Sequence, residues 1–153
     1  MIFPVGMVYS DDISFLKEAD VICTATNSTS PLFNREVLKP GVHINAIGSF
    51  QPHMQELDPF LLREARIYVD HTEPCLKESG DFIKPVKEGI TGDFPIIGEI
   101  GEYCLHKIRG RESDEEITVF KSVGVAIQDY AVAADIYHSS WQSGFGTEID
   151  LFK

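Results

Sequence analysis

Basic residues are scarce in this sequence, and long apolar runs are missing altogether. Only 13 Lys and Arg stand against 24 Asp and Glu, which gives a net charge of −11 at pH 7. So acidic a chain repels a nucleic-acid backbone and is not attracted to an anionic membrane. No apolar stretch approaches the length that crosses a bilayer, and Met1-Ile2-Phe3-Pro4-Val5 lacks the basic start of a signal peptide. We therefore expect a cytoplasmic protein that binds neither nucleic acid nor membrane.

Cysteine is also sparse, and its placement argues against both disulfides and a metal centre. Cys23, Cys75 and Cys104 are odd in number and widely spaced. Such a set fits reduced thiols better than a disulfide framework. Other potential ligands, such as His71 and His106, show no zinc-like spacing with cysteines or carboxylates. We predict no metal site.

Short apolar runs and helix-like segments alternate along the chain, which indicates an α/β fold with a mostly parallel sheet. The apolar runs predict strands over residues 20–26, 43–48, 66–70 and 117–120. Helices are expected over residues 13–19, 34–38, 60–65, 97–107 and 123–139, and residues 73–110 are otherwise less regular. Asp58 and Pro59 form a common type of helix start, in which an Asp cap is followed by a first-turn proline.

Three of the predicted strands run into small, polar or glycine-bearing residues. These segments are Thr24–Ser28, Ala46–Ser49 and Lys121–Gly124. In an open α/β sheet, ligands bind beyond the carboxyl ends of the strands. Small residues let a flat ring or a phosphate approach the backbone, and hydroxyls and free amides supply hydrogen bonds. Each segment alone is also typical of an ordinary strand-to-helix turn, but the three together favour a ligand crevice.

The same segments resemble motifs of the ornithine cyclodeaminase/mu-crystallin family. Asp20–Ser28 resembles the family's ADVI-TAT-S stretch, and Lys39–Ser49 resembles its KPG-HINA-G strand. Met54–Asp58 resembles a REL helix start, Glu78–Asp81 an ESGD segment and Thr118–Asp129 the closing TVFKS-G motif. One such motif would be weak, but these occur in order with family-like spacing over most of the chain.

The resemblance implies a fold and a division into domains. Residues 1–121 would form the later half of a Rossmann-like NAD(P)-binding domain with a mostly parallel sheet. Residues 122–153 would form a C-terminal helical segment and tail that packs on the family's substrate and dimerisation domain. No G-x-G-x-x-G phosphate loop occurs in the chain. The diphosphate site, the choice between NAD and NADP and most substrate contacts are therefore expected upstream, and we expect a homodimer or association with an upstream fragment.

Nine residues at the three strand ends are implied as contacts of the nicotinamide half of the cofactor. They are Thr24, Ala25, Thr26, Ile47, Gly48, Ser49, Ser122, Val123 and Gly124. Thr24, Ala25 and Thr26 would line the cofactor's path across the sheet edge. Ile47 and Gly48 would present backbone to its ribose and ring, and Ser122, Val123 and Gly124 would close the other side of the ring.

Phe50 departs from the pattern of the ornithine-cyclising members of the family. Those members place an aspartate that handles protons after N-A-x-G-x, whereas here Phe50 follows Asn45–Ser49. Phenylalanine cannot act as a general acid or base. The resemblance therefore implies an NAD(P)-dependent oxidoreductase that acts on a small amino or imino acid. It favours imine reduction, as in ketimine or pyrroline-2-carboxylate reductases. Two alternatives stay open: a truncated or split fragment that does not bind cofactor alone, and an ornithine cyclodeaminase, which is a lyase.

Other polar residues are weighed against ordinary structural roles. His43 is expected to be a partly exposed, hydrogen-bonded histidine, and His53 is a lesser candidate for touching substrate. Glu78 and Asp81 could form an acid–base pair, but helix capping and loop closure are favoured. Cys23 is expected to pack as a small apolar residue.

The predicted C-terminal helix carries an apolar set near helical spacing. Core packing is the ordinary interpretation. Because the resemblance implies that its covering domain lies elsewhere, we also expect self-association or pairing with a separate chain. The set is Val125, Ala126, Tyr130, Ala133, Ala134 and Tyr137.

Overall fold

The structure is a computed structural model that describes residue 6 and residues 9–150. The segment Met1–Val5, from which no signal peptide is predicted, lies outside the described residues. The chain divides into two compact units, Met1–Val123 and Gly124–Lys153. Each unit is described by itself.

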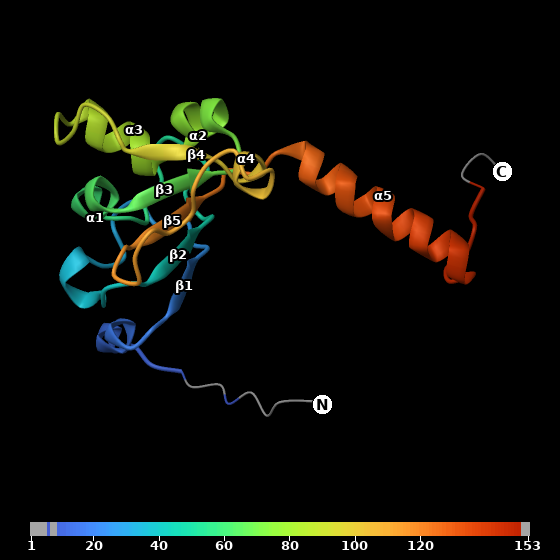
Figure 1. Cartoon of the computed structure of the whole chain (residues 1–153), viewed down its shortest axis with the longest axis horizontal. Coiled ribbons are helices and arrows are strands. Elements are labelled where there is room, and N and C mark those ends of the chain that lie inside the picture. Colours follow the sequence, from blue (N-terminus) through green and yellow to red (C-terminus); the bar gives the residue numbers. More distant parts are fainter. Residues whose placement is uncertain (1–5, 7–8, 151–153) are drawn as a thin grey trace. The chain divides into compact units, whose positions relative to one another are not determined.

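The first unit is built on a parallel sheet that has five strands within the described residues (Figure 1). Their order is β1-β2-β5-β3-β4, and each neighbouring pair is parallel. All the predicted strands are present, so the expected α/β class is confirmed. The strands are β1 (Val21–Thr24), β2 (His43–Ala46), β3 (Arg66–Val69), β4 (Ile96–Glu99) and β5 (Thr118–Lys121).

Short helices connect the strands of this unit. The expected start of the helix after Asp58 is confirmed, because the Asp58 carboxylate accepts a hydrogen bond from the Phe60 amide at 3.0 Å. Two of the predicted helices are short 3-10 helices. The helical elements are η1 (Ile13–Lys17), η2 (Arg35–Val37), α1 (Pro59–Glu64), α2 (Thr72–Glu78), α3 (Gly80–Lys87) and α4 (Ile100–Cys104).

The helix expected over residues 97–107 is wrong in its first part. Ile96–Glu99 instead forms β4, which pairs with β3 at the edge of the sheet, and the helix begins only at Ile100. A four-residue strand is too short for its periodicity to distinguish it from a helix, whereas pairing with β3 is a tertiary interaction. The Glu99 amide donates to the Glu102 carboxylate at 3.1 Å, which fixes the start of α4.

One face of the sheet forms the core with α1, α2 and α3. Side chains along a strand alternate between its two faces, so every second residue faces the helices. On β5 this alternation buries Val119 and then Lys121, which is fully buried at the end of the strand. The apolar core residues of strands and helices include Ile22, Ile44, Ala46, Ile67, Val69, Val119, Leu61, Leu62, Cys75 and Phe82.

The opposite face of the sheet is more open, and it corrects the expectation for Cys23. β1 is an edge strand that pairs with β2 alone in the described part of the chain. Its alternation sends Val21, which is 57% exposed, and Cys23 to the open face, so Cys23 is exposed rather than packed. Farther along the same face, a hollow of about 450 Å³ lies between aromatic side chains that include Tyr68, Tyr103 and Phe120.

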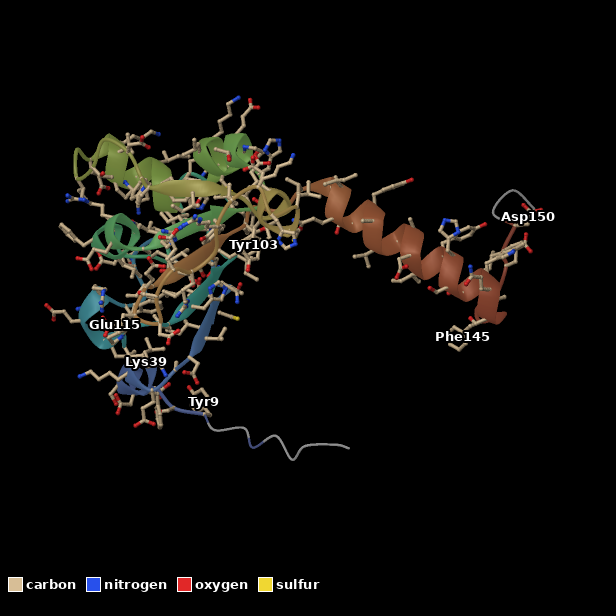
Figure 2. The ribbon with its side chains drawn as sticks, in the orientation of Figure 1. Tyr9, Lys39, Tyr103, Glu115, Phe145 and Asp150 are labelled. Carbon is tan, nitrogen blue, oxygen red and sulfur yellow. The ribbon has the colours of Figure 1, made fainter. Side chains whose placement is uncertain are left out.

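The second unit contains the helix α5 (Ala126–Ser143), which confirms the predicted C-terminal helix with a shift of a few residues. Its side chains project along its whole length (Figure 2), and none of its described residues is buried. Tyr130, Tyr137 and Trp141 are each more than half exposed. None of the helices within the described residues has both the length and the apolar character needed to cross a membrane.

Candidate functional site

The carboxyl ends of β1, β2 and β5 lie side by side. The Ile47 amide donates to the Thr24 carbonyl at 2.9 Å, which continues the pairing of β1 and β2 past their ends. The Ser122 amide donates to the Ala46 carbonyl at 3.1 Å, which does the same for β2 and β5. The structure therefore brings the three predicted strand ends to one edge of the sheet.

A hollow of about 460 Å³ opens at the ends of β1 and β2. Phe50 is 45% exposed and forms part of its wall, so the position at which the resemblance raised the question of an acid–base group holds an aromatic ring. Four of the nine predicted contact residues also line it. The lining residues are Ala25, Thr26, Asn27, Ile47, Gly48, Phe50 and Met54.

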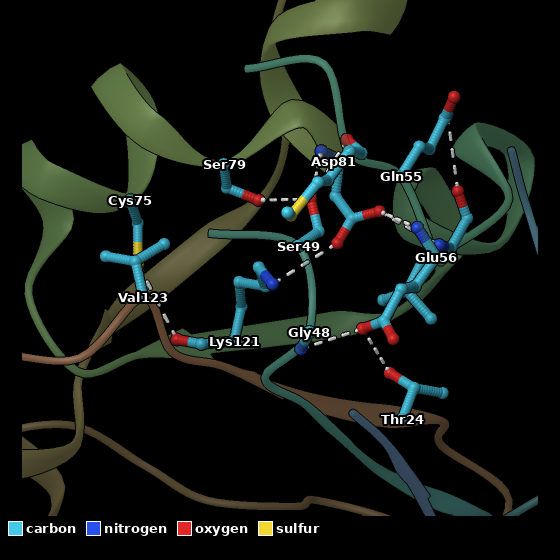
Figure 3. A network of polar contacts seen from close by, with 12 residues as sticks. Thr24, Gly48, Ser49, Gln55, Glu56, Cys75, Ser79, Asp81, Lys121 and Val123 are labelled. Carbon is cyan, nitrogen blue, oxygen red and sulfur yellow. Dashed lines mark hydrogen bonds and ion pairs between the residues drawn. The ribbon is translucent and has the colours of Figure 1, made fainter. Parts of the chain in front are cut away.

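A buried carboxylate, Glu56, holds the ends of β1 and β2 together (Figure 3). Its oxygens accept hydrogen bonds from the Thr24 hydroxyl at 2.8 Å, the Thr26 amide at 2.5 Å and the Gly48 amide at 2.9 Å. Burial raises the pKa of Glu56, but these hydrogen bonds outweigh it and hold the pKa below its usual value. Glu56 is therefore an ionised acceptor at neutral pH and fixes the backbone on two sides of the hollow.

Gly48 is required by the packing of the protein itself. A Cβ atom at this position would collide with the Thr26 backbone and with the Glu56 carboxylate. The sequence suggested that a glycine here admits a flat ring, and the structure adds that only a glycine lets β2 run this close to the end of β1.

A second buried carboxylate, Asp81, faces the end of β5. Its Oδ2 lies 3.3 Å from the Lys121 ammonium, and both side chains are completely buried. Its Oδ1 accepts hydrogen bonds from the Glu56 amide at 2.7 Å and the Leu57 amide at 2.9 Å. Burial raises the pKa of Asp81, and the nearby Lys121 charge and these two amides oppose that rise. The pair thus connects β5 to the segment that carries Glu56.

Asp70, just after β3, holds the segment that follows β5. Its carboxylate accepts hydrogen bonds from the Ser122 hydroxyl at 2.7 Å and the Val123 amide at 3.1 Å. It also accepts from the Cys75 thiol at 3.0 Å. Burial and the bond to Asp70 raise the pKa of Cys75 to about 12, so this thiol remains a protonated donor.

Seven of the nine predicted contact residues divide into a surface set and a supporting set. The surface set, Ala25, Thr26, Ile47 and Gly48, lines the hollow. The supporting set is Thr24, Ser49 and Ser122, which are buried. Their hydroxyls donate to the Glu56 carboxylate, the Met54 carbonyl and the Asp70 carboxylate, in that order. Val123 ends the first unit, where it is half-buried and packs against the apolar core. Gly124 begins the second unit with a φ of +83°, which favours glycine.

The remaining sequence candidates have ordinary environments. His43 is half-buried and shares a hydrogen bond with the Thr118 hydroxyl at 2.8 Å, as expected. His53 is exposed and does not line the hollow. Glu78 is exposed at the end of α2 whereas Asp81 is buried, so the two carboxylates form no acid–base pair. The loop-closing role expected of Asp81 is confirmed, because its carboxylate accepts hydrogen bonds from the amides of Glu56 and Leu57.

The sequence places Lys121 at one of the three strand ends but assigns its side chain no role, and it does not single out Glu56 or Asp70 as parts of this site. For Lys121 a signal was available: it follows Val119 in the alternation of β5, so the strand pattern alone places a lysine on the core side. A charge at such a position requires a buried partner of opposite sign.

Comparisons with known proteins agree with this geometry. The ornithine cyclodeaminase/mu-crystallin family model matches residues 5–144. Over 145 residues the chain is 44% identical to the Delta(1)-pyrroline-2-carboxylate reductase of Bacillus cereus, a match that covers 94% of this chain and 44% of that protein.

Solved structures give the same result. The Delta(1)-pyrroline-2-carboxylate reductase of Thermococcus litoralis, in complex with NADH and L-proline, superposes with a TM-score of 0.82 at 35% identity, over 93% of this chain and 44% of that one. An archaeal alanine dehydrogenase dimer with bound NAD superposes with a TM-score of 0.75 at 41% identity, over 86% of this chain and 41% of that one. The chain thus spans less than half the length of these relatives. It belongs to the ornithine cyclodeaminase/mu-crystallin family.

Proposed function

We propose that this chain supplies the nicotinamide-binding half of an NAD(P)-dependent reductase that acts on the carbon–nitrogen double bond of a small imino acid. The observation that carries the proposal is the hollow at the ends of β1 and β2, which small residues line and Phe50 flanks. Relatives named as pyrroline-2-carboxylate reductases, one of them in complex with NADH and L-proline, support it. Within the proposal, residues 1–121 form the partial Rossmann-like domain and residues 122–153 the segment that meets the substrate domain. Three free cysteines fit work in the reducing cytoplasm.

The residues around the hollow fit a nicotinamide group. A volume of about 460 Å³ is within the range of small-molecule sites. Ala25 and Gly48 leave room for a flat ring, Ile47 offers it an apolar surface, and Glu56 holds the backbone amides of this edge in place. When bound, the cofactor supplies a hydride for reduction. The chain's own part is to orient the ring on a fixed backbone and to keep water away from it.

Phe50 separates imine reduction from ornithine cyclodeamination. The cyclising reaction is expected to use an acid–base group where Phe50 stands, and a phenyl ring has no proton to give or take. Reduction of an imine needs one proton for nitrogen, which a group outside this chain can provide. Phe50 thus favours the reductase over the lyase.

Titration with NADH and NADPH tests the proposal through nicotinamide fluorescence. Ala25→Leu should weaken binding at least about tenfold, because the larger side chain occupies the hollow. Val21→Leu is the matched control, since Val21 is an exposed residue of β1, the strand that precedes Ala25, and does not line the hollow. It should leave the affinity unchanged.

The outcomes of this titration distinguish a chain that binds the cofactor alone from a fragment that does not. Binding by the chain alone, sensitive to Ala25→Leu and not to Val21→Leu, supports the site. If the chain binds only after addition of an upstream segment with a glycine-rich phosphate loop, it is a fragment that needs that segment. No binding under either condition overturns the proposal.

We further propose that α5 mediates self-association. Its tyrosines and Trp141 are exposed, and the archaeal alanine dehydrogenase relative is a dimer. Sedimentation velocity should show a species larger than a monomer, which Tyr137→Glu shifts toward the monomer. Gln128→Glu adds the same charge to the same helix and should have little effect. A wild-type chain that sediments as a clean monomer contradicts this proposal.

A further inference from the structure

We propose that Asp81 is a positioning residue for the nicotinamide-facing edge and acts on it through Glu56, with Lys121 as its buried counter-charge. The inference rests on the proposed function for its consequence in binding, but the contacts that carry it belong to the chain alone. The side chains of Asp81 and Lys121 do not line the hollow, so neither is a catalytic residue.

A continuous path of contacts joins the three strand ends (Figure 3). It starts at the Lys121 ammonium at the end of β5 and crosses 3.3 Å to Asp81 on α3. The other oxygen of Asp81 holds the Glu56 amide at 2.7 Å. The Glu56 carboxylate then holds the amides of Thr26 and Gly48, which are the backbone groups beside the hollow. The Asp81 amide also donates to the Ser49 hydroxyl at 3.2 Å, so the loop after β2 is attached twice.

Stability alone explains this pair poorly. Burying two charges costs a large desolvation free energy, and apolar residues of similar size often stabilise a core at least as well. Within the described residues, no hydrogen bond reaches the Asp81 Oδ2 or the Lys121 Nζ beyond their ionic contact. The geometry gives Asp81 a further use, because its Oδ1 holds the turn that presents Glu56 while its Oδ2 faces the Lys121 ammonium.

Two double variants test the inference without leaving an uncompensated buried charge. Asp81→Asn with Lys121→Met removes both charges but keeps an oxygen that can accept from the Glu56 and Leu57 amides. Asp81→Ala with Lys121→Met removes that acceptor as well. Two-dimensional ¹H–¹⁵N NMR of the free chain follows the Thr26 and Gly48 amides, whose resonances depend on their hydrogen bonds to the Glu56 carboxylate. NADH titration follows the consequence in affinity.

The Asn-containing variant should keep both amide resonances and the wild-type affinity. The Ala-containing variant should shift both resonances and weaken NADH binding about tenfold, while the core amide of Ile67 remains in place. Resonances of Thr26 and Gly48 that stay put in the Ala-containing variant, or that move equally in both variants, overturn the inference.

A single variant keeps the test decisive if the Ala-containing protein does not fold. Glu56→Gln leaves Asp81 and Lys121 unchanged and alters only the hydrogen bonds that the Glu56 carboxylate accepts from the Thr26 and Gly48 amides. It should therefore shift the resonances of these two amides and weaken NADH binding. Shifted amides with unchanged affinity would show that positioning has no consequence for the site. A wild-type chain that binds no NADH, alone or with an upstream segment, sinks the proposed function instead, and the NMR comparison of the double variants still decides whether the contacts position this edge.

Discussion

Lys121→Met is expected to lower the free energy of unfolding by about 3–5 kcal/mol at neutral pH. The variant leaves the Asp81 carboxylate buried with two amide donors and no opposite charge. Urea unfolding measures the loss. Lys17→Met is the matched control, because Lys17 is exposed and its replacement should change stability by no more than about 0.5 kcal/mol. Equal stabilities of the two variants would contradict the buried ion pair.

The decrease in the free energy of unfolding caused by Lys121→Met should become larger as pH rises. Burial raises the pKa of Asp81, and in the wild type the Lys121 charge opposes that rise. Without Lys121 the folded-state pKa lies further above the unfolded value, so the folded protein gains stability from protonation at low pH and loses it as pH rises through the folded pKa. The destabilisation should therefore be smaller at pH 5 than at pH 8. Adding Asp81→Asn should restore most of the stability and remove this dependence.

The sequence predicts the architecture well where a local pattern is sufficient. Apolar runs locate β1, β2, β3 and β5, and the helix start at Asp58 follows from its cap. The parallel arrangement follows from the alternation of strands and helices. The sequence predicts the beginning of a helix where β4 lies, because these four residues become a strand only by pairing with β3.

The edge of the sheet that carries the site can also be predicted from local strand patterns, whereas the buried residues that hold this edge in place cannot. Strand ends of a parallel sheet meet at one edge, so residues 24–26 and 47–49 could be placed together from the sequence. Whether Thr24 or Ser49 faces the hollow or the interior depends on partners distant in sequence, such as Glu56, which lies 32 residues from Thr24. A buried carboxylate is recognised only when its donors are known.

Glu56→Gln is expected to lower the free energy of unfolding by about 1–3 kcal/mol at neutral pH. The Gln oxygen can still accept from one side, but its NH₂ group turns toward an amide of Thr26 or Gly48 that needs an acceptor. Glu88→Gln makes the same chemical change at an exposed position and should alter stability by no more than about 0.5 kcal/mol.

The effect of Glu56→Gln should fade in acid. Burial raises the pKa of Glu56, but its hydrogen bonds from Thr26, Thr24 and Gly48 lower it further, so the folded pKa lies below the ordinary value of 4.5. A carboxylate with a depressed folded pKa contributes stability above the unfolded pKa and loses it as pH falls through the folded one. The difference in unfolding free energy between wild type and variant should therefore begin to narrow as pH falls below the ordinary pKa of 4.5 and should close as pH falls through the folded pKa. Asp81 titrates in the opposite sense, but it is common to both proteins and cancels in their difference. A gap that stays constant from pH 7 into the acid range would mean that Glu56 is not the ionised acceptor that joins β1 to β2.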